Sequence, residues 1–371
     1  METPMTGSNH PINPKDIDQA RQDLWKKYRC INATKAALFN LVVYVRKNSL
    51  SEEYVEKLIH NVVKKFPCRI ILIMEVADQQ NSYLHTFVSD LQIEGSSSFV
   101  FCDIVRFEVC GKHVQQVPFL LFSNILANLP IYLLWTEDLC ELSPISFMLE
   151  QYITRIVFDS ETTKDLFVFA QTLLNLHKKF PFDIGDINWA RLSSWRALFA
   201  HAFNSPSKLQ CIQNAHHIII SFNEIDQSRH LHNKIQAIYF QAWIASKLHW
   251  TFSRSSDEDH KLHFLYASQQ GEIAIEISPK THSQVLAGRI LELQISSKDS
   301  KMSFSTHSEN SQQIILHYST EVNCEMPVYY LFDKDFIGRS IIQEIYSQGT
   351  KTSFLEILHC ILQYQKEILH E

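Results

Sequence analysis

The stretch Cys68–Val76, CRIILIMEV, carries an almost continuous run of apolar residues directly after Pro67. A strand without alternation of apolar and polar residues is typical of a parallel sheet whose two faces are both covered. A similar segment, Ala36–Val45 (AALFNLVVYV), precedes it, and between the two Ser51 opens a predicted helix that ends near Lys65. This strand–helix–strand order predicts an α/β arrangement.

Further strands are expected at Ser98–Val109, Leu129–Thr136 and Thr154–Phe158. A short helix is expected at Ile145–Tyr152, and a longer one over about Thr162–Lys179 closes this half of the chain. The first half therefore predicts an α/β N-terminal domain, with a mostly parallel sheet covered by helices.

The pattern changes after Pro181 and Gly185, which mark a turn. Strands are predicted at 215–222, 261–267, 271–277, 288–296, 312–318 and 326–332, and helices at 234–250, 334–347 and 351–369. The serine-rich run Ser296–Ser311 is interpreted as containing a turn, at Ser297–Lys301. Strands followed by helices predict an α+β domain with an antiparallel sheet and C-terminal helices.

Three parts are expected along the chain. They are a flexible leader at 1–16, an α/β sandwich domain at 17–182, and an α+β domain at 183–371 with a tryptophan/arginine helix, antiparallel strands and a terminal helix pair.

The chain has 371 residues, 45% of them hydrophobic, and a formal net charge of −6, which argues against a nucleic-acid binder. The uncharged run Val114–Thr136 is split by Pro118 and Pro130, so no membrane span is expected. Eight cysteines without a CxxC motif fit a reduced, cytoplasmic protein. Cys102 and Cys110 lie on adjoining strand-like segments, yet two unrelated thiols remain the simpler interpretation.

Only eight glycines are present, and none forms a dinucleotide- or triphosphate-binding motif, so no cofactor is expected. The loop with His260 and His263 is interpreted as solvated rather than as a metal site, since odd spacing in a strand points two side chains to opposite faces.

Two pairs of carboxylates follow predicted strands, where open α/β sheets place ligands. They are Glu137 with Asp138, and Asp159 with Glu161. These acidic loops support an alternative function, a sugar-phosphate-binding hydrolase or lactonase, although no nucleophile or positioned base accompanies them.

The most unusual stretch is Asp186–Phe203, DINWARLSSWRALFAHAF. Asp186 or Asn188 is expected to cap a helix that presents Arg196 within an apolar stripe, with Arg191 and Trp195 one turn apart on another face. The candidate partner-binding or interface-supporting residues are Asp186, Asn188, Trp189, Arg191, Trp195 and Arg196.

Two interpretations remain open for this helix. In one, Arg196 pairs internally with Asp183 or Asp186, and the tryptophans fill the join between the two halves. In the other, part of the surface contacts a protein partner, because tryptophan and arginine dominate the energetics of interfaces.

The same segments carry a family resemblance. The stretch 186–196 resembles the D-x-N-W-x-R-L-x-x-W-R signature of the OpcA family, the assembly and activating subunits of glucose-6-phosphate dehydrogenase. The stretch 243–250, WIASKLHW, is similar to that family's W-L-A-x-R-L-x-W helix, and 67–69, 117–118, 129–135, 155–160 and 335–340 fit other segments in order. The chain departs from the pattern at Leu134, Ala242 and Lys247.

The resemblance implies a non-catalytic, cytoplasmic protein that binds oligomeric glucose-6-phosphate dehydrogenase and promotes its active form in the oxidative pentose phosphate pathway. It implies neither a cofactor nor a metal, and no nucleic-acid or membrane partner.

Overall fold

The computed structural model describes residues 6–7, 10–28, 33–47, 49–77, 82–94, 99–139, 152–225, 233–298, 300–306, 312–332, 338–347 and 349–364. The predicted helix at 145–152 lies outside these ranges except for Tyr152, and Cys30 and Cys140 lie outside them entirely. Contacts within the chain define two compact units. Unit 1 comprises Met1–Asp159, Leu176–Ile187 and Phe336–Gly349, and unit 2 comprises Ser160–Asn175, Asn188–Asp335 and Thr350–Glu371.

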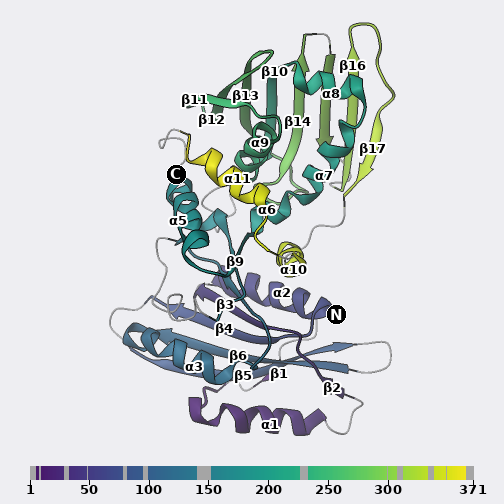
Figure 1. Cartoon of the computed structure of the whole chain (residues 1–371). Coiled ribbons are helices and arrows are strands. Elements are labelled where there is room, and N and C mark those ends of the chain that lie inside the picture. The colour runs from purple at the N-terminus through teal and green to yellow at the C-terminus, as the bar shows by residue number, and fades with distance from the viewer. Residues whose placement is uncertain are drawn as a thin grey trace. The chain divides into compact units, whose positions relative to one another are not determined.

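Unit 1 is built on a nine-stranded sheet in the order β1-β5-β6-β4-β3-β7-β8-β9, with β2 beside β6 (Figure 1). The strands are β1 Thr6–Gly7, β2 Ala33–Lys35, β3 Asn40–Arg46, β4 Arg69–Val76, β5 Leu84–Glu94, β6 Phe99–Cys110, β7 Ile131–Trp135, β8 Arg155–Phe158 and β9 Asp183–Asp186. From β6 to β9 every neighbouring pair is parallel, whereas β5 is antiparallel to β6. The predicted parallel sheet is confirmed, and the sequence missed β5 and β9.

Helices cover both faces of this sheet. They are η1 Pro14–Asp16, α1 Ile17–Tyr28, α2 Ser49–Lys65, η2 Gly111–Gln116, α3 Val117–Asn124 and α10 Arg339–Tyr346. In Figure 1, α2 and α10 lie on one face, and α1 and α3 on the other. Val55, Leu58 and Val62 of α2 pack on Leu41 and Val43 of β3 in one continuous core. This two-sided cover explains why the central strands are apolar without alternation.

The described part of the leader is tied to the sheet. Thr6 and Gly7 pair with Asp90 and Ser89 of β5, and the amide of Ile12 donates to the Thr86 carbonyl at 2.8 Å. This pairing differs from the flexible segment expected over residues 1–16, because strand β5, which was not predicted, pairs with the leader along its outer edge.

Unit 2 contains an eight-stranded sheet in the order β11-β12-β13-β10-β14-β15-β16-β17. Its strands are β10 Ala215–Asn223, β11 Thr251–Glu258, β12 Lys261–Ser268, β13 Gly271–Lys280, β14 Ile290–Ser297, β15 Ser300–Thr306, β16 Gln313–Thr320 and β17 Val328–Leu331. All pairs are antiparallel except β10 with β13. The α+β class is confirmed.

Helices pack on one face of this sheet (Figure 1). They are α6 Ile187–Arg191, α7 Ser193–Ala202, α8 Pro206–Gln213, α9 Ile235–Lys247 and α11 Thr352–Ile361, and η4 Ser160–Thr162 and α5 Leu166–Lys179 precede them in the chain. Along β12, Leu262, Phe264 and Tyr266 are buried while the intervening residues are not, as a sheet covered on one face requires. The predicted turn at Ser297–Lys301 is shorter than expected, and the serine-rich run that follows is β15.

The two C-terminal helices belong to different units. Arg155 at the start of β8 pairs with Glu344 of α10 at 3.0 Å, and both side chains are buried. Gly338, just before α10, approaches Leu58 of α2. These contacts hold α10 in unit 1, whereas the sequence placed both terminal helices in one domain.

No helix within the described ranges has both the length and the hydrophobicity that crossing a membrane requires.

Candidate functional site

The tryptophan/arginine segment is not the single helix that its sequence predicts. Asp186 is the last residue of β9, where it pairs with Phe158, and it directly precedes Ile187, the first residue of α6. Helix α6 then ends at Arg191, and α7 begins at Ser193 after Leu192, whose ψ of −3° departs from the helical value. The backbone amides of Leu192 and Arg196 still donate to the carbonyls of Asn188 and Leu192, so the two helices follow each other directly. Arg191 and Arg196 have different partners.

Both tryptophans of the segment are buried in unit 2. Trp189 packs against Phe354 of α11, and Trp195 packs against Phe240 of α9 and Phe332. Their indole rings therefore build the core around α9 and contribute almost no accessible surface.

The positive charge of Arg196 is stabilised by groups of its own segment. Its guanidinium lies 3.5 Å from the centroid of the Trp189 ring, and its Nη1 donates to the Trp189 carbonyl at 2.6 Å. An indole face and a backbone carbonyl are thus two of the groups that contact Arg196. Asp183 lies 3.8 Å from Arg155.

Asn188 and Arg191 belong to a buried cluster that we call the signature network. Its members come from η4, α6, α9 and the start of β14, and they are Ser160, Glu161, Asn188, Arg191, Gln236 and Arg289. Arg191 Nη1 lies 2.8 Å from Glu161 Oε1 and donates to Asn188 Oδ1 at 2.8 Å. Glu161 was predicted as half of an acidic pair, and the structure gives it this arginine partner.

The amide groups extend the network. Asn188 Nδ2 donates to Ser160 Oγ at 3.0 Å, and Gln236 Nε2 donates to Asn188 Oδ1 at 3.2 Å. Arg289 Nη1 approaches Gln236 Oε1 at 3.5 Å. Segments far apart in the sequence are thereby joined by charge-assisted and amide hydrogen bonds in a buried setting.

Gly288 lets the chain pass close to this network. Its φ is +73°, a left-handed value, and a Cβ built there would lie 3.3 Å from Glu161 Oε1 and 3.1 Å from the Asn233 carbonyl. A residue with a side chain is disfavoured at such a position. The network therefore depends on glycine at 288, which the sequence alone did not reveal.

The signature network has the character of a structural anchor. Its carboxylate is matched by Arg191, the Asn188 amide donates to Ser160, and the Gln236 amide donates to Asn188. A buried ion pair with its hydrogen bonds satisfied fixes geometry more than it supplies reactivity. The six candidate residues divide accordingly, since Asn188 and Arg191 belong to the network, Trp189, Trp195 and Arg196 belong to the packing around it, and Asp186 lies in β9.

The carboxyl edge of the parallel sheet in unit 1 is where open α/β sheets bind ligands. Here the rings of Tyr44 and Trp135 stack with centroids 4.0 Å apart at the ends of β3 and β7. The Tyr44 hydroxyl contacts the Glu75 carboxylate, and burial together with that carboxylate raises the pKa of Tyr44. Stacked aromatic rings beside a carboxylate do not fit the phosphates of a dinucleotide.

The remaining acidic candidates also lie near this edge. Glu137 Oε1 accepts a hydrogen bond from the Arg46 amide at 2.8 Å. Asp138 and Asp159 are buried. In the described part of the chain, no three His, Cys, Asp or Glu residues gather as a metal site would require.

The histidine-containing loop is a hairpin turn. Asp259 and His260 have φ values of 54° and 61° between β11 and β12, as the tightest hairpin turns require. His263 lies within β12 opposite Ser256. The two histidines are therefore separated by turn and strand geometry.

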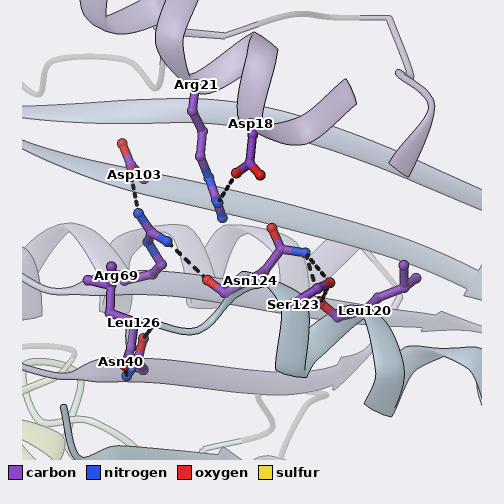
Figure 2. A network of polar contacts seen from close by, with 9 residues as sticks. All are labelled: Asp18, Arg21, Asn40, Arg69, Asp103, Leu120, Ser123, Asn124 and Leu126. Carbon is purple, nitrogen blue, oxygen red and sulfur yellow. Dashed lines mark hydrogen bonds and ion pairs between the residues drawn. The ribbon is translucent and has the colours of Figure 1, made fainter. Parts of the chain in front are cut away.

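Unit 1 contains a second arginine cluster, which no sequence motif predicted (Figure 2). Arg69 at the start of β4 donates to Asp103 Oδ2 at 2.7 Å and to the Asn124 carbonyl at 3.0 Å, and Arg21 of α1 donates to Asp18 Oδ1 at 3.2 Å. Arginines scattered over α1 and β4 carry no motif, so only the tertiary structure brings them together.

An exposed apolar surface lies at the β16–β17 hairpin in unit 2. It is formed by Val322, Met326, Val328, Tyr329 and Leu331, and we call it the hairpin surface. Met326 is 86% exposed and Leu331 is 74% exposed. Strand β17 ends the sheet within the described residues. Large apolar side chains gathered on an edge strand are a characteristic of interaction sites.

Comparison with solved structures shows the fold of the chain. A mutant of Gal80p from Saccharomyces cerevisiae superposes with a TM-score of 0.52 at 8% identity, covering 88% of this chain and 95% of the other. A protein from Erwinia carotovora atroseptica named as an oxidoreductase gives 0.50 at 8% identity, covering 90% and 99%. At such low identities the similarity concerns the arrangement of the elements alone.

Two curated relatives carry the name OxPP cycle protein OpcA. The one from Synechocystis is 25% identical over 248 residues, which are 63% of this chain and 50% of the relative. The one from Nostoc punctiforme is 22% identical over 244 residues, which are 62% and 50%. The chain thus matches about half the length of these relatives.

Two family models match the chain in order. The model described as the glucose-6-phosphate dehydrogenase subunit N-terminal domain, OpcA_G6PD_assem, matches residues 60–173, and the corresponding C-terminal domain, OpcA_G6PD_C, matches 183–319. These ranges include β4 to β8 of unit 1 and the whole tryptophan/arginine segment, and together they cover more than half of the chain. The chain belongs to the OpcA family.

Proposed function

We propose that this protein is a non-catalytic assembly factor and allosteric activator of glucose-6-phosphate dehydrogenase. The observation that carries the proposal is the match of both OpcA domain models, each described as part of a glucose-6-phosphate dehydrogenase subunit, across both halves of the chain. The relatives' names assign them to the oxidative pentose phosphate cycle. The proposed site of action is the cytoplasm.

The physical requirement for activation is differential affinity. A partner raises the population of an active dehydrogenase conformation only if it binds that conformation more tightly than the inactive one. Activation therefore needs a protein-facing surface held in a fixed shape, and it needs no reactive group on this chain.

The hairpin surface supports such a role, and we assign it to the contact with the dehydrogenase. Met326 and Leu331 expose most of their apolar area in one short stretch of chain. Apolar and aromatic side chains that become buried at the centre of an interface supply most of its binding free energy.

The tryptophan/arginine segment has an indirect part in this proposal. Asn188, Trp189, Arg191, Trp195 and Arg196 support the interface by fixing the helices on which the sheet of unit 2 packs. The contacts that these five residues make within unit 2 favour a role in shaping the unit over direct contact with a partner.

The test is co-purification with the dehydrogenase of the same organism, followed by dehydrogenase kinetics with and without this chain. Leu331→Asp should weaken binding by about tenfold or more, because a charge at the centre of an apolar interface must be desolvated. Activation should then require correspondingly higher concentrations of this chain.

Phe119→Asp is the matched control. Phe119 is 65% exposed on α3 of unit 1, so its replacement makes the same chemical change on another surface. If the wild-type chain binds the dehydrogenase and both variants bind it equally well, the hairpin surface is not the contact. A chain that neither binds the dehydrogenase nor alters its rate would remove the proposed function itself.

The same purified chain, assayed alone on sugar phosphates and phosphogluconolactone, tests the catalytic alternative. Turnover that Glu137→Gln or Asp159→Asn abolishes would establish an enzyme.

A further inference from the structure

The parallel strands of unit 1 follow the order of the dinucleotide-binding α/β fold. They lie in the sheet as β6-β4-β3-β7-β8-β9, so the earliest of them in the chain, β3, stands beside β7, and the chain reverses its course across the sheet between these two strands. Sheets of this order bind a dinucleotide at the carboxyl ends of the strands, at the point of reversal. The ends of β3 and β7 are therefore the place where the fold implies a cofactor.

Two aromatic rings fill this place. Tyr44 and Trp135 are partners in the register of β3 and β7, and their rings stack with centroids 4.0 Å apart and planes within 5° of parallel. Trp135 is fully buried, and Tyr44 is only 2% exposed. Because both rings are buried and cover each other, a planar ligand would have to displace one of them.

The acidic residue of such a site is also engaged by the chain. In dinucleotide sites, an acidic residue beyond the first helix hydrogen-bonds a ribose hydroxyl. Glu75, near the end of β4, is a residue of that type, and its carboxylate accepts a hydrogen bond from the Tyr44 hydroxyl. The phenol hydroxyl thus makes the bond that a ribose hydroxyl would make.

The turn after β3 is matched in the same way. Dinucleotide sites have a glycine-rich turn there, which lets backbone amides approach the pyrophosphate. This chain has Val45, Arg46 and Lys47 at that point, and the Arg46 amide donates to Glu137 Oε1 at 2.8 Å. Lys47 Nζ lies 2.9 Å from Glu108 Oε2 at the end of β6. A carboxylate of the chain therefore stands where a phosphate oxygen would accept.

We propose that unit 1 carries a built-in substitute for a dinucleotide, formed by the stacked rings of Tyr44 and Trp135 and the carboxylate of Glu137, so that the chain binds no nicotinamide dinucleotide. The residues present do not fit that cofactor, because the ring space, the acidic residue and the amide of the first turn are all taken by the chain itself. Thr136 Oγ1 also donates to the Tyr44 carbonyl at 2.9 Å. The ends of β3 and β7 are thereby joined without a ligand.

The first measurement titrates NADH and NADPH separately into the purified full chain without the dehydrogenase, so it is independent of the proposed function. Nicotinamide fluorescence follows binding, and thermal unfolding is measured with and without each dinucleotide. We expect no saturable signal up to about 1 mM and no shift in the melting temperature, since a bound ligand stabilises the folded state. Saturable binding of either dinucleotide by the wild-type chain would overturn the proposal.

The second measurement tests whether the stacked rings occupy the space of a ligand. Trp135→Ala removes one ring and leaves a buried gap beside Tyr44, and enclosed apolar gaps of this kind take up small aromatic molecules. Millimolar indole should therefore raise the melting temperature of this variant by about 2–4 °C and leave that of the wild-type chain unchanged.

Trp25→Ala is the matched control, because Trp25 is half-buried on α1 and the loss of its ring leaves no enclosed gap. Its melting temperature should not respond to indole. An effect of indole that is equal in the two variants, or absent from both, would contradict the assignment of the two rings.

Should Trp135→Ala fail to fold, Glu137→Ala supplies the same test at the position of the phosphate. The substitution removes the acceptor of the Arg46 amide. Acetate should then raise the melting temperature by about 2 °C relative to chloride at equal ionic strength, because a charged acceptor strengthens an amide hydrogen bond. Glu53→Ala, which removes an exposed carboxylate from α2, is the control and should not respond. Equal responses of the two variants, or none in either, would remove Glu137 from the proposal.

Discussion

The two units each bury arginines among polar groups, but they complete the hydrogen bonds of those arginines in opposite ways. In unit 2, Arg191 meets the buried Glu161 and Asn188, and the amides beside them close the network. In unit 1, Arg21 has an exposed carboxylate for a partner, and two of its buried nitrogens find no acceptor among the described residues. Buried charges that are paired and hydrogen-bonded fix local geometry, whereas buried donors without acceptors carry a cost in stability.

Arg191→Ala tests this difference between the units and should have the largest effect on stability. It leaves the Glu161 carboxylate buried without its guanidinium, so we expect a loss of about 3–5 kcal/mol in the free energy of unfolding. Urea denaturation followed by circular dichroism measures it.

The double variant Arg191→Met/Glu161→Leu is the control, because removing both charges together leaves no unpaired ion. It should recover most of the lost stability. A loss below about 1 kcal/mol for Arg191→Ala would mean that the pair is solvated and the network is not an anchor.

Gly288→Ala tests how tightly the chain passes the signature network. A left-handed backbone costs a residue with a side chain about 1–2 kcal/mol, and contact with Glu161 Oε1 should add to that. Thermal unfolding provides the measurement. Gly349→Ala is the matched control, since its φ of +72° is nearly the same while a Cβ there meets nothing within 4 Å. Equal losses in the two variants would show that the network tolerates an added methyl group.

Arg21→Gln should have the smallest effect on stability, within about 1 kcal/mol. The substitution removes a buried charge whose ion-pair partner, Asp18, is exposed, so little favourable interaction is lost. Urea denaturation checks it. A loss as large as that of Arg191→Ala would show that Arg21 is a structural residue, and the contrast between the two clusters would disappear.

The parallel core of unit 1 was readable from the sequence, because Cys68–Val76 and Ala36–Val45 are apolar on both faces. The polar strand β15 was not, since Lys301, Ser303 and Ser305 alternate with two buried residues and their composition resembles a loop. Strand β5 was missed for a similar reason. Alternation within a polar composition is a weak signal until neighbouring strands pair with it.

In the candidate site, too, some features could be predicted from the sequence and others could not. The unusual composition of residues 186–196 identified the segment correctly as part of the family signature. The one continuous helix expected there is instead two consecutive helices that meet at Leu192, because periodicity does not show where a helix is interrupted. Glu161 was noticed as an acidic residue after a strand, but nothing in the sequence joined it to Arg191 thirty positions later.

By itself, the sequence determined the two fold classes and the family, because apolar periodicity and a dense motif are local properties of the chain. The tertiary structure alone decided which charges meet. It paired Arg191 with Glu161, brought α10 to Arg155, and left two buried nitrogens of Arg21 without acceptors among the described residues. The free energy of a buried charge depends on neighbours that folding brings from distant positions, and no local pattern encodes them.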